Sequence, residues 1–147
     1  MFDILVRSHS GLRWIALLLL IIAIGNALAS KSSGKYLKKD KMINLFGMVF
    51  LHVQLLLGLI LYFMSPKVSM AEGWMKVSWM RFFTLEHALM MIVAIILVTI
   101  GRKKAEKESS DKKKHAKIAL WYGIALVLIF LAIPWPFRAN LGVTSWF

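Results

Sequence analysis

Residues 12–29 read LRWIALLLLIIAIGNALA, an apolar run in which Arg13 is the one charged side chain. At about 1.5 Å per residue, a helix over this run is about 27 Å long, which is close to the ~30 Å hydrocarbon core of a bilayer. The run is too long for a signal peptide and has no A-x-A-like cleavage site, so we expect it to remain in the mature protein. Three further apolar runs follow, and the sequence predicts membrane-spanning helices over 12–29, 43–64, 82–101 and 118–133.

The composition agrees with a lipid environment. Hydrophobic residues make up 59% of the 147 residues and charged residues 18%, and the mean hydropathy is +0.69, so the four runs are expected to face lipid rather than water. The chain has no cysteine, which excludes disulfides, thiolate metal ligands and covalent attachment of c-type haem. We therefore expect one transmembrane domain over 1–147, with any metal bound by histidine, methionine or carboxylate.

The positive charge is concentrated between the predicted spans. Thirteen of the 19 basic residues lie in two loops, 30–42 and 102–117, and cytoplasmic loops of membrane proteins carry such an excess. This pattern predicts both loops in the cytoplasm and both termini on the periplasmic side of a bacterial inner membrane. Loops this short are expected to contact anionic lipid, and the same pattern argues against a nucleic-acid partner.

The connections between the predicted spans are short. Short connections make consecutive helices antiparallel neighbours. The expected fold class is therefore all-α, an integral membrane up-and-down four-helix bundle. Four spans in 147 residues leave no room for a soluble catalytic domain, so we expect no independent chemistry beyond electron or proton transfer.

Each predicted span carries one histidine inside it or at its edge. A histidine within hydrocarbon requires a partner, because an unpaired polar group is unfavourable there. Counting about 1.5 Å per residue from the predicted cytoplasmic helix ends puts His115 near 0 Å, His52 at about 15 Å, His87 at about 21 Å and His9 at about 30 Å. His52 and His87 are the closest in depth, so they are the predicted pair of metal ligands. The alternative for each is an interhelical hydrogen bond.

Further polar groups lie toward the outer ends of the spans. His9 and Arg13 are one helical turn apart and are candidate cofactor-binding residues, for haem propionates or a quinone head group; Arg13 alternatively reaches lipid phosphates. Glu86 is expected to pair with Arg13 or Arg81. His115 lies among lysines and is expected to belong to the charged interface only.

The segments HSGLRW (9–14), EH (86–87), KKHAK (113–117) and IPWP (133–136) together resemble a family of small four-span bacterial membrane proteins labelled cytochrome b-like. More broadly, the chain resembles the four-helix haem b anchor subunits of respiratory oxidoreductases, in which histidines on membrane helices ligate iron and a quinone binds nearby. The resemblance implies haem b as the cofactor. The histidines do not form two pairs of matching depth, so a second haem is not implied.

The predicted function is a b-type haem electron-transfer protein of the respiratory chain, which passes electrons between a quinone pool and a partner subunit. One alternative is a cofactor-free accessory or structural subunit of a larger membrane complex. Another is a small proton or solute transporter that uses Arg81, Glu86 and His87. The expected partners are the lipid bilayer, a quinone, and other membrane subunits or further copies of this chain.

Overall fold

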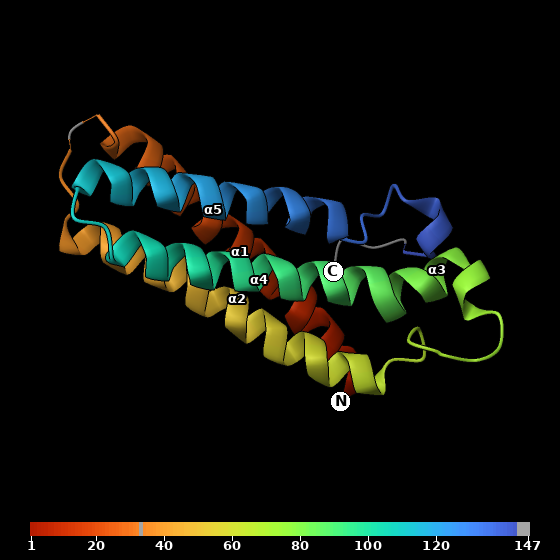
Figure 1. Cartoon of the computed structure of the whole chain (residues 1–147). Coiled ribbons are helices and arrows are strands. Elements are labelled where there is room, and N and C mark those ends of the chain that lie inside the picture. Colours follow the sequence, from red (N-terminus) through yellow and green to blue (C-terminus); the bar gives the residue numbers. More distant parts are fainter. Residues whose placement is uncertain (33, 144–147) are drawn as a thin grey trace.

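A computed structural model of the chain describes residues 1–32 and 34–143, and these form an all-helical structure (Figure 1). The four long helices are α1 (Phe2–Ser30), α2 (Lys38–Met64), α4 (His87–Glu106) and α5 (Asp111–Ala132). Short helical segments complete the end of the bundle opposite the basic loops, which we call the outer end: η1 (Trp74–Lys76), α3 (Ser78–Arg81), the π-helical η2 (Phe82–Glu86) and η3 (Ala139–Leu141). The segments α3, η2 and α4 follow one another without a break. The predicted all-α class is confirmed, and four helices are long and apolar enough to cross a membrane.

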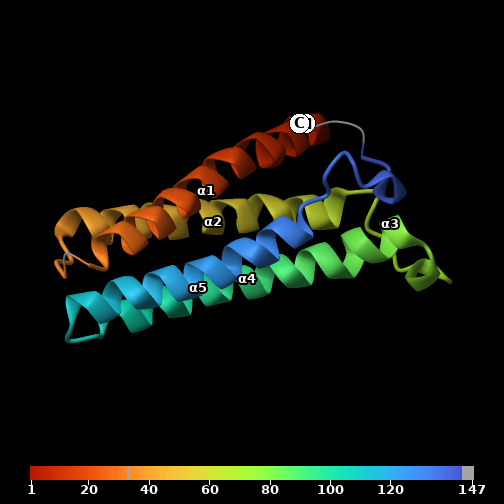
Figure 2. The same ribbon diagram turned by 90° about the horizontal axis from the view of Figure 1, so that it is seen from above.

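Consecutive long helices run in opposite directions, as the two perpendicular views show (Figures 1 and 2). The main contacts of α1 are with α2 and α5, and those of α4 are with α5 and α2. Two diagonal pairs therefore face each other across the interior, α1 with α4 and α2 with α5. In Figure 1, α1 and α2 run obliquely past α4 and α5 toward the end that carries the N-terminus.

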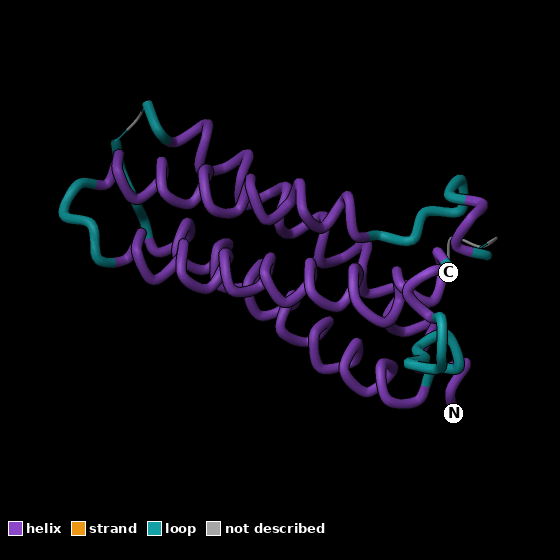
Figure 3. The backbone as a smooth tube through the Cα atoms, turned by 45° about the vertical axis from the view of Figure 1, so that its right-hand side comes forward, coloured by secondary structure: helices purple, strands orange, loops and turns teal. Residues whose placement is uncertain are grey.

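The helices extend beyond the predicted spans. Helix α1 begins at Phe2 rather than at 12, and α2 begins at Lys38 rather than at 43. Helix α4 continues to Glu106 rather than ending at 101, and α5 begins at Asp111 rather than at 118. The predicted bounds followed hydropathy, whereas the helical hydrogen bonds continue through polar residues. The chain traced as a tube shows how short the loops at the basic end are as a result (Figure 3).

The middle of the bundle is packed with small and branched apolar side chains. Leu20, Ala23, Ala94, Val98 and Ala125 are each fully buried. Alanine at helix contacts lets the backbones approach closely, which is the usual way of packing helices in lipid. We call the following set the apolar layer: Leu17, Leu20, Ala23, Leu51, Ala94, Ile95, Val98, Ala125 and Ile129. Large apolar side chains such as Leu56 and Val127 point outward and are about 60% exposed (62% and 60%).

The contact between α4 and α5 depends on Gly101. A Cβ added at Gly101 would lie 2.6 Å from Cγ of Trp121 and would also overlap its Cβ. We expect Gly101→Ala to lower the free energy of unfolding by about 1–3 kcal/mol, the usual effect of overpacking. Thermal unfolding in detergent measures this. Gly123→Ala is the matched control, because a Cβ at Gly123 meets nothing within 4 Å; equal melting temperatures for the two variants would contradict this account of the contact.

Candidate functional site

Two histidines from diagonal helices meet at the outer end of the bundle. The ring centroids of His9, on α1, and His87, at the start of α4, lie 6.4 Å apart with their planes at 78°. Nδ1 of His87 is 2.7 Å from the carbonyl oxygen of Ala132, at the end of α5. A carbonyl only accepts a hydrogen bond, so Nδ1 is the protonated nitrogen and Nε2 keeps its lone pair in the neutral ring. We call His9 and His87 the outer histidine pair.

The lengths of the helices explain why these two histidines are level. His9 lies 21 residues before Ser30, the last residue of α1, and His87 lies 19 residues before Glu106, the last residue of α4. At about 1.5 Å per residue these separations are about 31 and 29 Å. The predicted depth of His87 was about 21 Å because the helix was taken to end at Gly101. The extension of α4 to Glu106 raises His87 to the depth of His9.

A π-helical turn immediately precedes His87. Across it, Nε of Arg81, the last residue of α3, donates to Oε1 of Glu86 at 2.7 Å. Residues five apart diverge by about 140° on an α-helix but by only about 50° on a π-helix, so the π turn brings these two side chains to the same side of the helix. The structure thus selects Arg81 as the ion-pair partner of Glu86 from the two candidates. The hydroxyl of Tyr62 donates to the carbonyl oxygen of Thr84 at 2.9 Å, which ties the turn to α2.

Helix α2 packs closely against His9 through a glycine and a glutamine. A Cβ added at Gly58, on α2, would come within 3.3 Å of Cε1 of His9. Nε2 of Gln54 donates to the backbone oxygen of His9 at 2.9 Å, which holds this turn of α1 against α2. Nδ1 of His9 is buried and has no hydrogen-bond partner among the described residues. Gly58 therefore lets the His9 ring approach α2 closely, and one ring nitrogen of the outer histidine pair has no hydrogen-bond partner among the described residues.

The predicted cofactor-binding residue Arg13 lies one turn along α1 from His9. Its guanidinium lies 5.3 Å from the ring centroid of Trp14, and it is near enough to His9 and His87 to interact with both electrostatically. The site therefore includes a cation beside the two imidazoles. The sequence placed Arg13 correctly beside His9 because the spacing of four is one helical turn.

The structure does not bring His52 together with His87. Nδ1 of His52 donates to the carbonyl oxygen of Met48 at 2.8 Å, and Nε2 is 3.4 Å from Oγ1 of Thr99. Thr99 is twelve residues along α4 from His87, or about 18 Å. His52 therefore lines a separate groove of about 270 Å³ between α2 and α4, together with Leu55, Ile92, Ile95, Ile96, Thr99 and Ile100. No three His, Cys, Asp or Glu side chains in residues 1–32 and 34–143 form a metal-binding group.

The basic end of the bundle holds a buried polar cluster that the sequence did not predict. His115 is completely buried, and its Nε2 donates to the carbonyl oxygen of Lys35 at 2.7 Å, so it is not simply part of the charged interface. Tyr36 lies beside it, with ring centroids 5.1 Å apart. The Tyr36 hydroxyl donates to Glu106 at 2.9 Å and accepts from Asn44 at 3.0 Å. Burial raises the pKa of Tyr36 to about 12, so it remains a neutral hydrogen-bonding group.

Compared with protein-family models, curated proteins and solved structures, the chain matches none.

Proposed function

We propose that the chain is a four-span protein of the bacterial inner membrane, with the basic loops in the cytoplasm and both termini in the periplasm. Four helices of sufficient length and hydropathy support the spans. The grouping of thirteen of 19 basic residues at one end of the bundle supports the orientation.

Single cysteines test this topology directly, because the natural chain has none to remove. Ser109 lies in the exposed loop between α4 and α5, and Ala71 lies in the exposed loop after α2. In spheroplasts we expect a membrane-impermeant maleimide to label Ala71→Cys at least tenfold more than Ser109→Cys. Both variants should react after the membrane is disrupted, which controls for the reactivity of each site. Labelling of Ser109→Cys alone in intact spheroplasts would show the opposite orientation.

We further propose that the outer histidine pair holds a b-type haem. The observation that carries this proposal is the spacing of the two rings. Two imidazole nitrogens bonded in line to one metal ion, at about 2 Å each, place their ring centroids about 6 Å apart, and the observed separation is 6.4 Å. The two histidines come from diagonal helices, so a ligand between them would lie in the interior and would not separate neighbouring helices.

The residues around the pair fit such a group. The donor set is two imidazoles, which are common ligands of the iron in b-type haem proteins. The lone pair of His87 Nε2 is free to bind a metal, and the hydrogen bond from Nδ1 to Ala132 orients the ring and increases its basicity. Gly58 lets the His9 ring pack closely against α2, and Arg13 supplies a positive charge for a carboxylate group. When bound, the haem would supply one-electron redox chemistry.

In this proposal each residue has a distinct task. His9 and His87 would hold the iron of the haem through their imidazole nitrogens. Arg13 balances negative charge at the site. The apolar layer beneath the pair excludes water from the cytoplasmic side. These properties suit electron transfer, with a quinone and neighbouring membrane subunits as the proposed exchange partners, more than they suit oxygen chemistry.

Absorption spectroscopy of the detergent-purified protein, expressed with ample haem, tests the proposal. The expected result is a Soret band with sharp α and β bands after reduction with dithionite, as for six-coordinate low-spin haem. A pure, folded protein without a Soret band would exclude haem binding. It would favour a cofactor-free accessory subunit, in which His87 serves only to join α4 to α5 through Ala132.

A further inference from the structure

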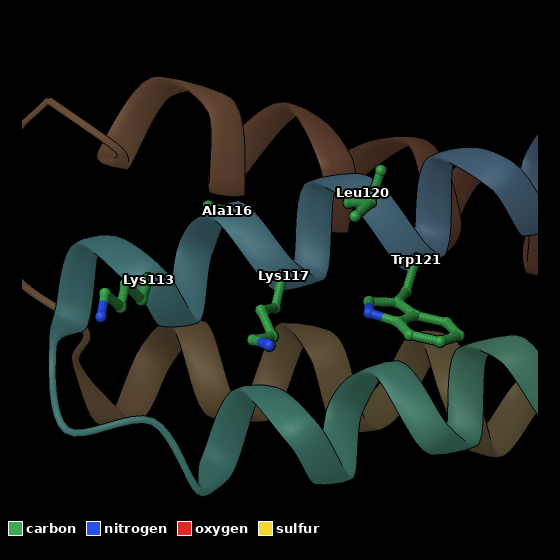
Figure 4. Close-up of a pocket in the computed structure, with 5 residues that line it drawn as sticks. All are labelled: Lys113, Ala116, Lys117, Leu120 and Trp121. Carbon is green, nitrogen blue, oxygen red and sulfur yellow. The ribbon is translucent and has the colours of Figure 1, made fainter.

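A groove with one charged end runs along the outer surface of α5 at the basic end of the bundle. Its volume is about 250 Å³. The residues that line it are Lys113, Ala116, Lys117, Leu120 and Trp121 (Figure 4). The spacings of three and four place all five on one face of the helix. We call this the α5 groove. No part of the haem proposal uses it.

The charged end of the α5 groove can attract an anion. Among the described residues Lys113 has no hydrogen-bond or ion-pair partner, so its ammonium group faces solvent without a counter-ion. Lys117 is paired with Glu108 at 3.0 Å. Nζ of Lys104, on α4, lies 4.8 Å from the centroid of the Trp121 ring. Three lysines thus converge on the groove, and one nearby carboxylate offsets their charge only in part.

The other end of the groove is apolar and continues toward the middle of the bundle. Leu120 is 58% exposed, and the exposed side chains Ile124, Val127 and Leu131 follow it along the same helix. From Leu120 to Leu131 this track is about 16 Å long at about 1.5 Å per residue. A hydrocarbon chain laid along it would cover apolar surface that is otherwise unpartnered within the chain.

Trp121 joins the two ends. Its side chain packs against Gly101 on α4, which fixes the position of the indole. In Figure 4 the indole nitrogen lies on the side of the ring that faces Lys117. The ring therefore presents an N–H donor toward the charged end, as tryptophans at membrane interfaces do.

We propose that the α5 groove binds an anionic phospholipid of the cytoplasmic leaflet. The phosphodiester lies near Lys113 and Lys117, where the ammonium groups and the Trp121 N–H supply charge and donors. One acyl chain follows the track from Leu120 to Leu131. A phospholipid would contact both the charged and the apolar end of the groove, whereas a soluble anion would contact the lysines alone. The proposal rests on membrane insertion with the basic loops inward, and it is independent of haem.

Native mass spectrometry of the full-length protein in detergent, titrated with phosphatidylglycerol or phosphatidylcholine, tests the proposal. We expect phosphatidylglycerol to bind at least tenfold more tightly. The double variant Lys113→Gln, Lys117→Gln should weaken phosphatidylglycerol binding about 25-fold, at about fivefold per lysine. The matched control is Lys31→Gln, Lys39→Gln, which removes the same charge from exposed positions of the other basic loop and should change the affinity less than twofold.

Three outcomes would overturn the proposal. Equal binding of the two lipids would show no selection for the anion. Equal weakening by both double variants would show attraction to the whole basic end rather than binding in the groove. Full competition by inorganic phosphate at millimolar concentration would identify a site for soluble anions. The haem spectrum of the double variant separates the two proposals, since it should match that of the natural protein whether or not lipid binding is lost.

Discussion

Replacing His87 with alanine is expected to abolish the low-spin haem spectrum of the purified protein, and replacing His9 with alanine should do the same. Each change removes one of the two imidazoles that lie 6.4 Å apart, and a single imidazole leaves the iron five-coordinate and high-spin or unbound. The reduced-minus-oxidised spectrum at matched protein concentration measures the loss. We expect less than about a tenth of the natural low-spin amplitude.

His52→Ala is the matched control. It also removes one histidine from a long helix, but this ring contacts Met48 and Thr99 rather than the outer histidine pair. The low-spin spectrum should therefore persist in His52→Ala. If His52→Ala lost the spectrum and His9→Ala retained it, the pairing of His52 with His87 predicted from the sequence would be the correct one.

Replacing Asp40 with alanine should produce the largest loss of stability among single changes at the basic end. Asp40 is 4% exposed, and its carboxylate accepts from Nδ2 of Asn26 at 2.6 Å and from the backbone N–H of Leu37 at 2.7 Å. Alanine would leave both donors without this acceptor, at about 1–3 kcal/mol for each. We expect the free energy of unfolding to fall by about 2–6 kcal/mol, measured by denaturant titration in detergent.

Asp3→Ala controls for the position of the charge. Asp3 also lies in the first turn of a long helix, so its interaction with the helix dipole is comparable, but its side chain is exposed. Its removal should change stability by less than about 1 kcal/mol. A loss as large as that of Asp40→Ala would mean that helix electrostatics, rather than the buried hydrogen bonds, account for the effect.

The fold follows from the sequence because its determinants are local. Four apolar runs separated by short charged loops predict four antiparallel helices, and this is the architecture observed. The ends of the helices were harder to predict. The apolar runs end where charged residues begin, but the helical hydrogen bonds continue through those residues. The helical turn from Arg102 to Glu106 is the clearest case.

The position of the C-terminal end of α4 decides which histidines lie at the same depth in the bundle. With α4 ending at Gly101, His87 is closest in depth to His52. With α4 ending at Glu106, it is closest to His9. The diagonal arrangement of α1 and α4 also depends on tertiary packing that a pattern of hydropathy does not contain. Gly58 and Gln54, which contact His9, are a small and a polar residue within an apolar run, so they stand out in the sequence. Only the folded bundle shows that they face α1.

The apolar layer has an electrical consequence. It separates the polar cluster around Tyr36 and His115 from the outer histidine pair, and its members are alanine, leucine, isoleucine and valine. A charge moving through such a layer loses its hydration, and a membrane potential of 100 mV adds or subtracts only about 2.3 kcal/mol per elementary charge. In the proposed membrane-inserted state, most of the membrane potential would therefore fall across this apolar layer. With the proposed haem and orientation, an electron exchanged at the outer histidine pair from the periplasmic side would cross little of that potential, so the redox equilibrium of the haem should be nearly independent of membrane potential.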